Sequence, residues 1–314
     1  MTGTDKKAVR GYCMYDWGKS AFETSVTTAI LPPWFLYLFL EANGLTTTIA
    51  GIEMSGTAIW SYSVGIATLI VAMLSPSFGV IADRRMIKMW WLRILTYLGA
   101  GATFLLAVAG TGLIPISMKW AWLMIMFVLA NIGLNGAGVF YNALLPHLGD
   151  ENEMDDISNR AFAYGYFGGG ILLLVHLAMV MLLTGDWVLP FVMASSGIWW
   201  FGFALLTFKW VPEPHIEEEM EFKSFIESSK FALSEVRSTL KKHKDFRTLF
   251  FFMLAYFFYI DGINSVTALA GVFGPAVLGL TTTDLILAIL AIQFVAAPSA
   301  IGFTKIAEKY STKS

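Results

Sequence analysis

The sequence predicts an all-α integral membrane protein, built as a bundle of eight spanning helices. Hydrophobic residues make up 56% of the 314-residue chain and charged residues only 14%, whereas soluble domains carry about 25% charged residues. The charges are also segregated, and each uncharged stretch reaches the roughly 20 residues that cross a bilayer as a helix. These stretches are 54–82, 94–118, 120–149, 161–185, 187–208, 262–283 and 285–304.

The spans follow one another in order along the chain. The first covers about 11–40, and because no short apolar signal core precedes it, we expect it to be retained. Spans two to six are the next five uncharged stretches. The seventh covers about 248–271, where only Asp261 interrupts it, and the eighth covers 285–304. The pentapeptide GLTTT precedes both the second and the eighth span, at 44–48 and 279–283. This indicates two parallel repeats, or a coincidence of Thr-rich helix starts.

This order divides the chain into three parts. Residues 1–208 form a six-helix half, 209–247 a cytoplasmic linker, and 248–314 the start of a second half. The linker contains an amphipathic pattern that predicts a helix lying on the membrane surface, and the same helix can join two bundles. Its apolar face comprises Phe222, Phe225, Ile226, Leu233, Val236 and Leu240.

The basic residues predict the orientation, since cytoplasmic loops carry an excess of Lys and Arg. With the N-terminus in the cytoplasm, every Lys and Arg lies inside except Lys119, which lies outside, and Lys19, which lies within the first span. We therefore expect a multi-pass protein with a cytoplasmic N-terminus, in the plasma (inner) membrane if the protein is bacterial.

Three charged residues stand at the head of the first apolar segment, in YDWGKSAFET (15–24). Asp16, Lys19 and Glu23 have the spacing i, i+3 and i+7, which places them on one helical face. Ionisable groups inside a bundle usually face its interior and pair with one another. One interpretation is an ion-pair knot that holds the helix to a neighbour. The other assigns Glu23, about 10 Å deeper by helical rise, to contact with a solute or a proton.

The sequence contains no motif for a cysteine metal cluster, for ATP hydrolysis or for enzyme catalysis. Cys13 is the one cysteine, so no cysteine metal cluster is possible. The chain contains no Walker loop, which argues against an ATP-driven pump. It also contains no HExxH motif, and no Ser/His/Asp cluster converges on one membrane face. We therefore expect no enzyme, no cofactor and no metal site. The expected partners are the lipid bilayer, a small-molecule solute and protons, without nucleic acid.

The segment between spans two and three, PSFGVIADRRMIKMWW, carries a family resemblance. Its residues Gly79, Asp83, Arg84, Arg85 and Lys88 resemble the G-x-x-x-D-R-x-x-G-R-[RK] gating loop of the major facilitator superfamily, without the second Gly-Arg pair. YDWGKSAF, VFYNALLPHL, SNRAFAYGYFGGG and FYIDGINSV are similar to the autophagy-related vacuole effluxer-like branch of that superfamily. Lys19 departs from that branch, which has Asn at this position, and the branch usually has Gly near Arg160.

The resemblance implies a bundle of the major facilitator type with twelve spans, so we expect this eight-span chain to lack the last four. It implies a secondary active transporter that moves a small polar solute by alternating access, with amino-acid efflux and proton coupling as the expected activity. The alternative is a non-transporting membrane sensor or assembly protein that keeps the fold.

The resemblance also implies a solute site between the first and seventh spans, near the middle of the membrane. Asp261 and Asn264 on span seven are the expected site residues of the second half, together with Asp16, Lys19 and Glu23 of the first. Asn135 on span four is a further candidate, although Asn residues in bundles often bond one helix to another. Gly165, Gly168 and Gly169 are expected to permit close helix packing.

Overall fold

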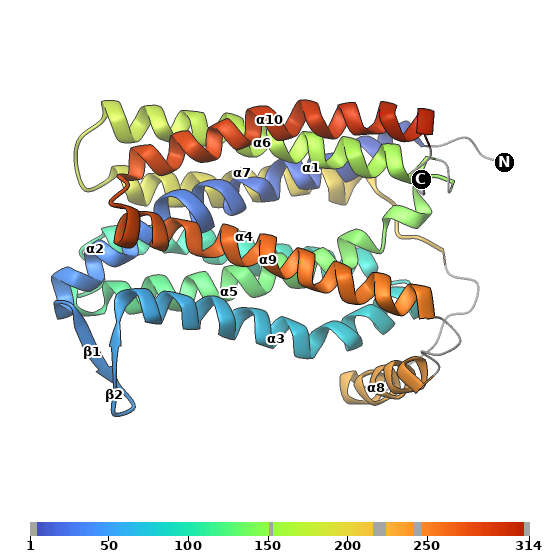
Figure 1. Cartoon of the computed structure of the whole chain (residues 1–314), viewed down its shortest axis with the longest axis horizontal. Helices are drawn as coiled ribbons and strands as arrows, with labels where there is room; N and C mark the ends of the chain where they lie inside the picture. Colours follow the sequence, from blue (N-terminus) through green and yellow to red (C-terminus); the bar gives the residue numbers. More distant parts are fainter. Residues whose placement is uncertain (1–4, 151–152, 216–223, 242–246, 311–314) are drawn as a thin grey trace.

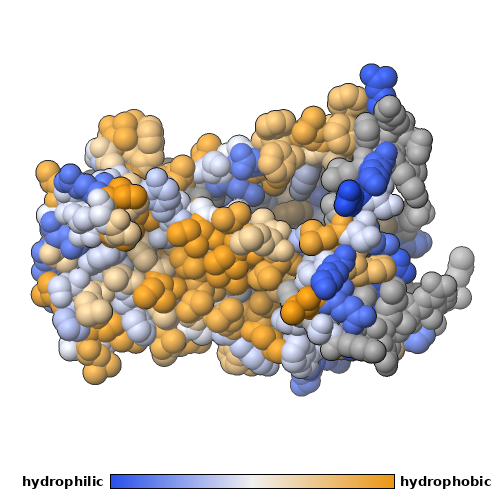
Figure 2. All heavy atoms as spheres, turned by 90° about the horizontal axis from the view of Figure 1, so that it is seen from below, coloured by the Kyte–Doolittle hydropathy of each residue, from blue (hydrophilic) through white to orange (hydrophobic). Residues whose placement is uncertain are grey.

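The computed structural model describes residues 5–150, 153–215, 224–241 and 247–310, which form a bundle of long helices lying side by side (Figure 1). In this part of the chain eight helices are long and apolar enough to cross a membrane, which confirms the predicted eight spans. Figure 2 shows hydrophobic side chains across the middle of one face, with hydrophilic ones toward its two ends. The spans are Lys6–Asn43, Gly56–Arg84, Lys88–Gly110, Ile116–His147, Met154–Leu182, Val188–Trp210, Arg247–Thr267 and Thr282–Ala300.

The first span is one continuous helix with three sections, α1 (Lys6–Ala21), the π-helix η1 (Phe22–Ile30) and α2 (Leu31–Asn43). It begins at Asp5, whose carboxylate accepts hydrogen bonds from the backbone N–H groups of Lys7 and Ala8. The π section ends just before Pro32 and Pro33, which have no N–H to continue the ladder of hydrogen bonds. The helical hydrogen-bonding pattern therefore changes in the middle of the span, in the stretch between Glu23 and α2.

A β-hairpin projects from the end of the bundle opposite the N-terminus (Figure 1). Its strands β1 (Thr46–Ile49) and β2 (Ile52–Ser55) are antiparallel, with Ile49 opposite Ile52. Ala50 and Gly51 form the two-residue turn and have φ values of 51° and 81°, as the tight turns of hairpins require. Ser55 then caps α3 (Gly56–Arg84) by accepting a hydrogen bond from the N–H of Ala58.

Four further spans follow α3. They comprise α4 (Lys88–Leu105) with the 3-10 turn η2 (Leu106–Gly110), α5 (Ile116–Asn142) with η3 (Leu145–His147), α6 (Met154–Leu182) and α7 (Val188–Trp210). α1 packs between α6 and α7, while α4 packs on α5 and α7. Glycines permit the closest approaches, since a Cβ at Gly168 would lie 2.4 Å from the carbonyl oxygen of Trp17.

Three helices follow, namely α8 (Phe225–Lys241), α9 (Arg247–Leu278) and α10 (Thr282–Tyr310). α8 lies at the end of the bundle that carries the N-terminus and contacts α3 (Figure 1). Ile226 and Leu233 on its predicted apolar face are exposed, while Phe222 lies outside the described residues. α9 extends beyond the predicted seventh span and contacts η1 and α2, and α10 packs along α6.

Candidate functional site

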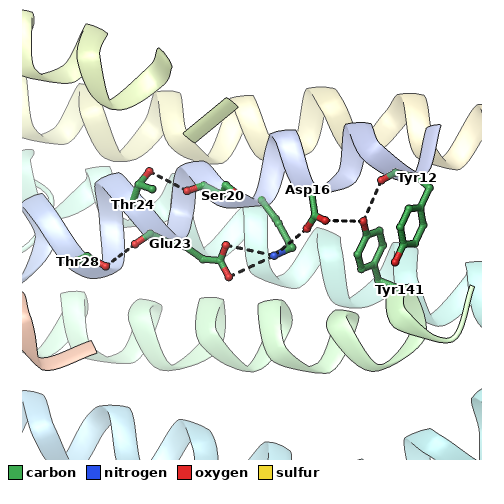
Figure 3. A network of polar contacts seen from close by, with 8 residues as sticks. Tyr12, Asp16, Ser20, Glu23, Thr24, Thr28 and Tyr141 are labelled. Carbon is green, nitrogen blue, oxygen red and sulfur yellow. Dashed lines mark hydrogen bonds and ion pairs between the residues drawn. The ribbon is translucent and has the colours of Figure 1, made fainter. Parts of the chain in front are cut away.

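The charged triplet of the first span, Asp16 and Lys19 on α1 and Glu23 on η1, forms one continuous chain of contacts (Figure 3). The ammonium nitrogen of Lys19 lies 3.1 Å from a carboxylate oxygen of Asp16 and 3.3 Å from one of Glu23. The spacing along one face of α1 therefore places Lys19 between two carboxylates, and one formal negative charge remains if all three are ionised.

Neighbouring tyrosines hold Asp16 in the bundle core. The hydroxyl of Tyr141, on α5, donates a 2.8 Å hydrogen bond to the second carboxylate oxygen of Asp16. The ring of Tyr141 stacks on Tyr12 with centroids 4.1 Å apart and on Tyr15 with centroids 4.8 Å apart. The hydroxyl of Tyr15 also bonds Thr96 on α4 at 2.8 Å. Asp16 thus joins α1 to α5 at a site where rings exclude water.

Exposure rises along the triplet toward Glu23. The side chain of Asp16 is 9% exposed, that of Lys19 is 19% and that of Glu23 is 44%. In the described part of the chain, the hydrogen bonds and ion pairs of the Glu23 carboxylate are with Lys19, and its exposure leaves the carboxylate partly open. One end of the triplet is therefore built into the core and the other end is open to a solute, an ion or a proton.

Glu23 also lies at the start of the π-helix, a kind of helix that frequently occurs at functional sites. The hydroxyl of Thr28 donates a 2.7 Å hydrogen bond to the carbonyl of Glu23, five residues earlier, and Thr24 donates one to Ser20. These hydroxyls supply hydrogen bonds where the ladder is widened, so the local sequence supports the change of register next to the carboxylate.

His176 ties the π-helix to two other helices. It is fully buried on α6, with Nδ1 2.8 Å from the hydroxyl of Ser25 and Nε2 3.0 Å from the hydroxyl of Ser195 on α7. Because Ser195 donates its proton to the carbonyl of Val192, it accepts from Nε2–H, and the Nδ1 of a neutral imidazole then accepts from Ser25. His176 therefore bridges α6 to η1 and α7.

The other predicted solute contacts lie apart from this chain of bonds. Asn135 is bonded within its own helix to Asn131, through both the carbonyl and the side-chain oxygen. Asp261 and Asn264 are exposed on α9. In the described part of the chain, no hydrogen bond or ion pair joins either of them to the triplet. What brings the two regions together is the packing of α9 on η1.

The predicted gating segment spans a helix end and a helix start. Gly79, Asp83 and Arg84 lie in the last turns of α3, where a Cβ at Gly79 would meet nothing within 4 Å. Arg85 follows as the residue that ends α3. Lys88 begins α4 and is 2% exposed.

Sequence reasoning missed the residue that fixes the end of this segment. The carboxylate of Glu213 accepts hydrogen bonds from the backbone N–H groups of Lys88, at 2.7 Å, and Met89, at 2.8 Å. It caps the N-terminus of α4 and thereby holds the segment that follows α7 against the bundle. Nothing in the local sequence indicates a cap that lies more than a hundred residues away. Tyr141 was missed for the same reason, although it lies in the quoted segment VFYNALLPHL.

The described part of the chain contains no candidate metal-binding site. Among these residues no group of three or more His, Cys, Asp or Glu side chains could hold a metal ion. Asp16, Lys19 and Glu23 of the first span bond one another, and Asp16 also bonds Tyr141. Eight apolar spans define a multi-pass membrane protein, and ion-paired residues inside such a bundle are typical of transporters.

The comparisons with known proteins agree with this class. The chain belongs to the family described as "Vacuole effluxer Atg22 like", which matches residues 4–314. It is 30% identical to the "Uncharacterized MFS-type transporter YxiO" of Bacillus subtilis (strain 168), over 98% of this chain and 69% of that protein. It is also 28% identical to "Autophagy-related protein 22-1" of Aspergillus clavatus, over 40% of this chain and 23% of that protein.

Solved structures show the same fold at low sequence identity. A D-xylose-proton symporter matches with a TM-score of 0.62 and 14% identity, over 97% of this chain and 69% of that one. The xylose transporter XylE from E. coli, in a partially occluded inward-open conformation, matches with a TM-score of 0.50 and 12% identity, over 97% and 72%. The chain is thus an integral membrane transporter of the major facilitator type, as the sequence predicted.

Proposed function

We propose that the protein is a secondary active transporter that moves a small polar solute by alternating access and couples this movement to protons through Glu23. The observation that carries the proposal is the rise in exposure from Asp16 to Glu23 along one ion-paired chain. A carboxylate that binds and releases protons needs a side open to water or solute, and ionisable groups within spans mark such proton relays. Glu23 keeps one side bonded to Lys19 and leaves the other side open.

Charge balance suggests how a proton would assist the movement. With Asp16, Lys19 and Glu23 all ionised, the triplet carries one net negative charge, and closing the bundle over it removes water from that charge. Charge without water is costly in a membrane interior. A proton on Glu23 makes the triplet neutral, while Lys19 stays paired with Asp16. The closed intermediate of alternating access is then reached more easily with the proton bound.

An amino acid is the solute class that we propose. The resemblance to the vacuole effluxer-like branch favours it, and so does the chemistry of the open end. Lys19 and Glu23 present opposite charges side by side, which complements a zwitterion. In this proposal Asp261 and Asn264 face the solute from the second half, and the segment from Gly79 to Lys88 takes part in gating. We further propose a cytoplasmic N-terminus, and the inner membrane as the location if the protein is bacterial.

The test is solute flux in proteoliposomes with a panel of amino acids. We expect Glu23→Gln to abolish accumulation driven by a pH gradient while it preserves counterflow exchange, since exchange needs no net proton movement. Glu41→Gln, which alters an exposed carboxylate at the end of α2, is the control and should retain both activities.

Three results would contradict parts of the proposal. A folded Glu23→Gln protein that still accumulates solute down a pH gradient rules out proton coupling through Glu23. A wild-type protein that is folded by thermal unfolding but moves none of the solutes favours a sensor or assembly protein with the transporter fold. Loss of folding in Glu23→Gln, with Glu41→Gln unaffected, would assign the triplet to structure.

A further inference from the structure

A cavity of about 510 Å³ lies at the end of the bundle that carries the N-terminus, far along α1 from Glu23. It forms where the starts of α1 and α4 meet the end of α7 and the residues that follow α7. Its size falls within the roughly 300–1,000 Å³ of small-molecule sites. Its described lining comprises Asp5, Lys7, Met89, Trp90, Arg93, Phe208, Lys209, Trp210, Val211, Pro212 and Glu213.

The charges of this cavity favour an anion. Its two carboxylates are already occupied, because Asp5 accepts from two backbone N–H groups at the start of α1 and Glu213 from two at the start of α4. The positive ends of those helices offset both negative charges. Lys7, Arg93 and Lys209 are all exposed, and none of them forms an ion pair with another described residue. Within the described part of the chain, three cations are therefore left to act on whatever enters.

Arg93 is held in place for such a role. One of its terminal nitrogens donates a 3.2 Å hydrogen bond to the carbonyl of Phe208, and its guanidinium lies 5.7 Å from the centre of the Phe208 ring. A guanidinium that is stacked and bonded on one edge loses little further freedom when its other donors bind a phosphate. The site thus has one positioned cation and two lysines on longer flexible stems.

An apolar path leads from the cavity along the outside of the bundle. Apolar residues share one face of α4 with Arg93 at helical spacing, namely Trp90, Ile94 and Tyr97. The face of α7 that carries Phe208 continues with Phe201 and Leu205. Tyr97 joins the two sets, with ring centroids 5.8 Å from Phe201 and 5.9 Å from Phe208. Each of Trp90, Ile94, Tyr97, Phe201 and Leu205 is between 38% and 53% exposed. A free anion needs no such path, whereas an acyl chain does.

We propose that this cavity, which we call the α1–α4–α7 site, binds the headgroup of an anionic phospholipid. Lys7, Arg93 and Lys209 contact the phosphate, Trp90 and Trp210 lie at headgroup level as aromatic residues do at membrane interfaces, and the acyl chains run along α4 and α7. Basic pockets between helices are known to take such headgroups. The site depends only on the membrane fold and is independent of the solute that the protein carries.

The test measures lipid bound to the purified protein by native mass spectrometry after exchange into phosphatidylglycerol or phosphatidylcholine. The site variant is Lys7→Gln/Arg93→Gln/Lys209→Gln. The control, Lys6→Gln/Arg10→Gln/Lys230→Gln, removes the same charge from exposed residues at the same end that do not line the cavity. One basic residue near anionic lipid contributes about a fivefold change in binding. We therefore expect the site variant to bind phosphatidylglycerol about a hundredfold more weakly, and the control to match the wild type.

Each other outcome decides against the proposal. Equal losses in the two variants would mean that general surface charge, and not the α1–α4–α7 site, holds the lipid. Equal retention of phosphatidylcholine would remove the role of anionic charge, and failure of the wild type to retain phosphatidylglycerol would remove the site. Displacement of the lipid by inorganic phosphate at moderate concentration, with no effect of chloride at equal ionic strength, would assign the cavity to a soluble anion.

Discussion

Lys19 occupies a position that could be foreseen from residue spacing alone, because helical geometry fixes which residues three and four apart meet. Both of its ion pairs lie within one helix, from Asp16 at i–3 to Glu23 at i+4. Tyr141 could not be foreseen in this way. Its bond to Asp16 joins residues 125 positions apart, so it depends on how α5 packs on α1. Spacing predicts contacts within a helix, and packing between helices decides the rest.

Tyr141 provides the residue-scale prediction. Tyr141→Phe keeps the ring that stacks on Tyr12 and Tyr15 but removes the donor to Asp16, which is buried. A hydrogen bond to a charged group contributes about 1.5–3 kcal/mol, so we expect the free energy of unfolding to fall by that amount. The measurement is thermal or denaturant unfolding in detergent.

The matched control for this substitution is Tyr62→Phe, whose ring is 60% exposed. It should leave the unfolding midpoint unchanged. Equal midpoints for Tyr141→Phe and the wild type would show that Lys19 alone is enough to satisfy Asp16, and the tyrosine would then have no structural part in the triplet.

At the scale of the helices, the sequence predicted the number and order of the spans well. It predicted the local geometry within and between them poorly. Runs without charge identify spans because a bilayer tolerates few charges. The π-helix η1 escaped this reasoning, since its composition resembles that of any apolar helix and its register depends on bonds such as Thr28 to Glu23 and Ser25 to His176. The hairpin at 46–55 also escaped it, because its last two residues fall inside the uncharged run 54–82 that predicted the second span.

The glycine pair at the crossing of α4 and α5 gives the element-scale prediction. A Cβ at Gly133 would lie 2.5 Å from the backbone of Gly99, which a side chain cannot accommodate unless the helices separate. Overpacking of this kind costs about 1–3 kcal/mol. We expect Gly133→Ala to lower the unfolding temperature, because the clash outweighs the gain of about 1 kcal/mol in helix propensity.

Gly138 on the same helix is the control, since a Cβ there would meet nothing within 4 Å. Gly138→Ala should be as stable as the wild type or more stable. If Gly133→Ala were equally well tolerated, the helices would be free to move apart at this crossing, and the close contact of Gly99 with Gly133 would not fix their distance.

At the scale of the whole molecule, the structure places the segments predicted inside and outside at opposite ends of the bundle. α8 and the first turn of α1 lie at one end, and the β-hairpin lies at the other (Figure 1). This separation is what the distribution of Lys and Arg requires. The excess of basic residues near the N-terminus favours that end as the cytoplasmic one.

Cysteine labelling in intact cells checks the orientation, and the structure selects the positions. At the hairpin end the exposed positions are Thr48 and Thr111, and a cysteine at either should react with a membrane-impermeant thiol reagent in intact cells. At the opposite end the exposed positions are Lys209 and Lys230, and a cysteine at either should react only after the cells are opened. Lys88 would be a poor reporter because it is 2% exposed. Native Cys13 is also 2% exposed and should stay silent as the background. The reverse labelling pattern would invert the topology and place the α1–α4–α7 site and the segment from Gly79 to Lys88 outside the cell.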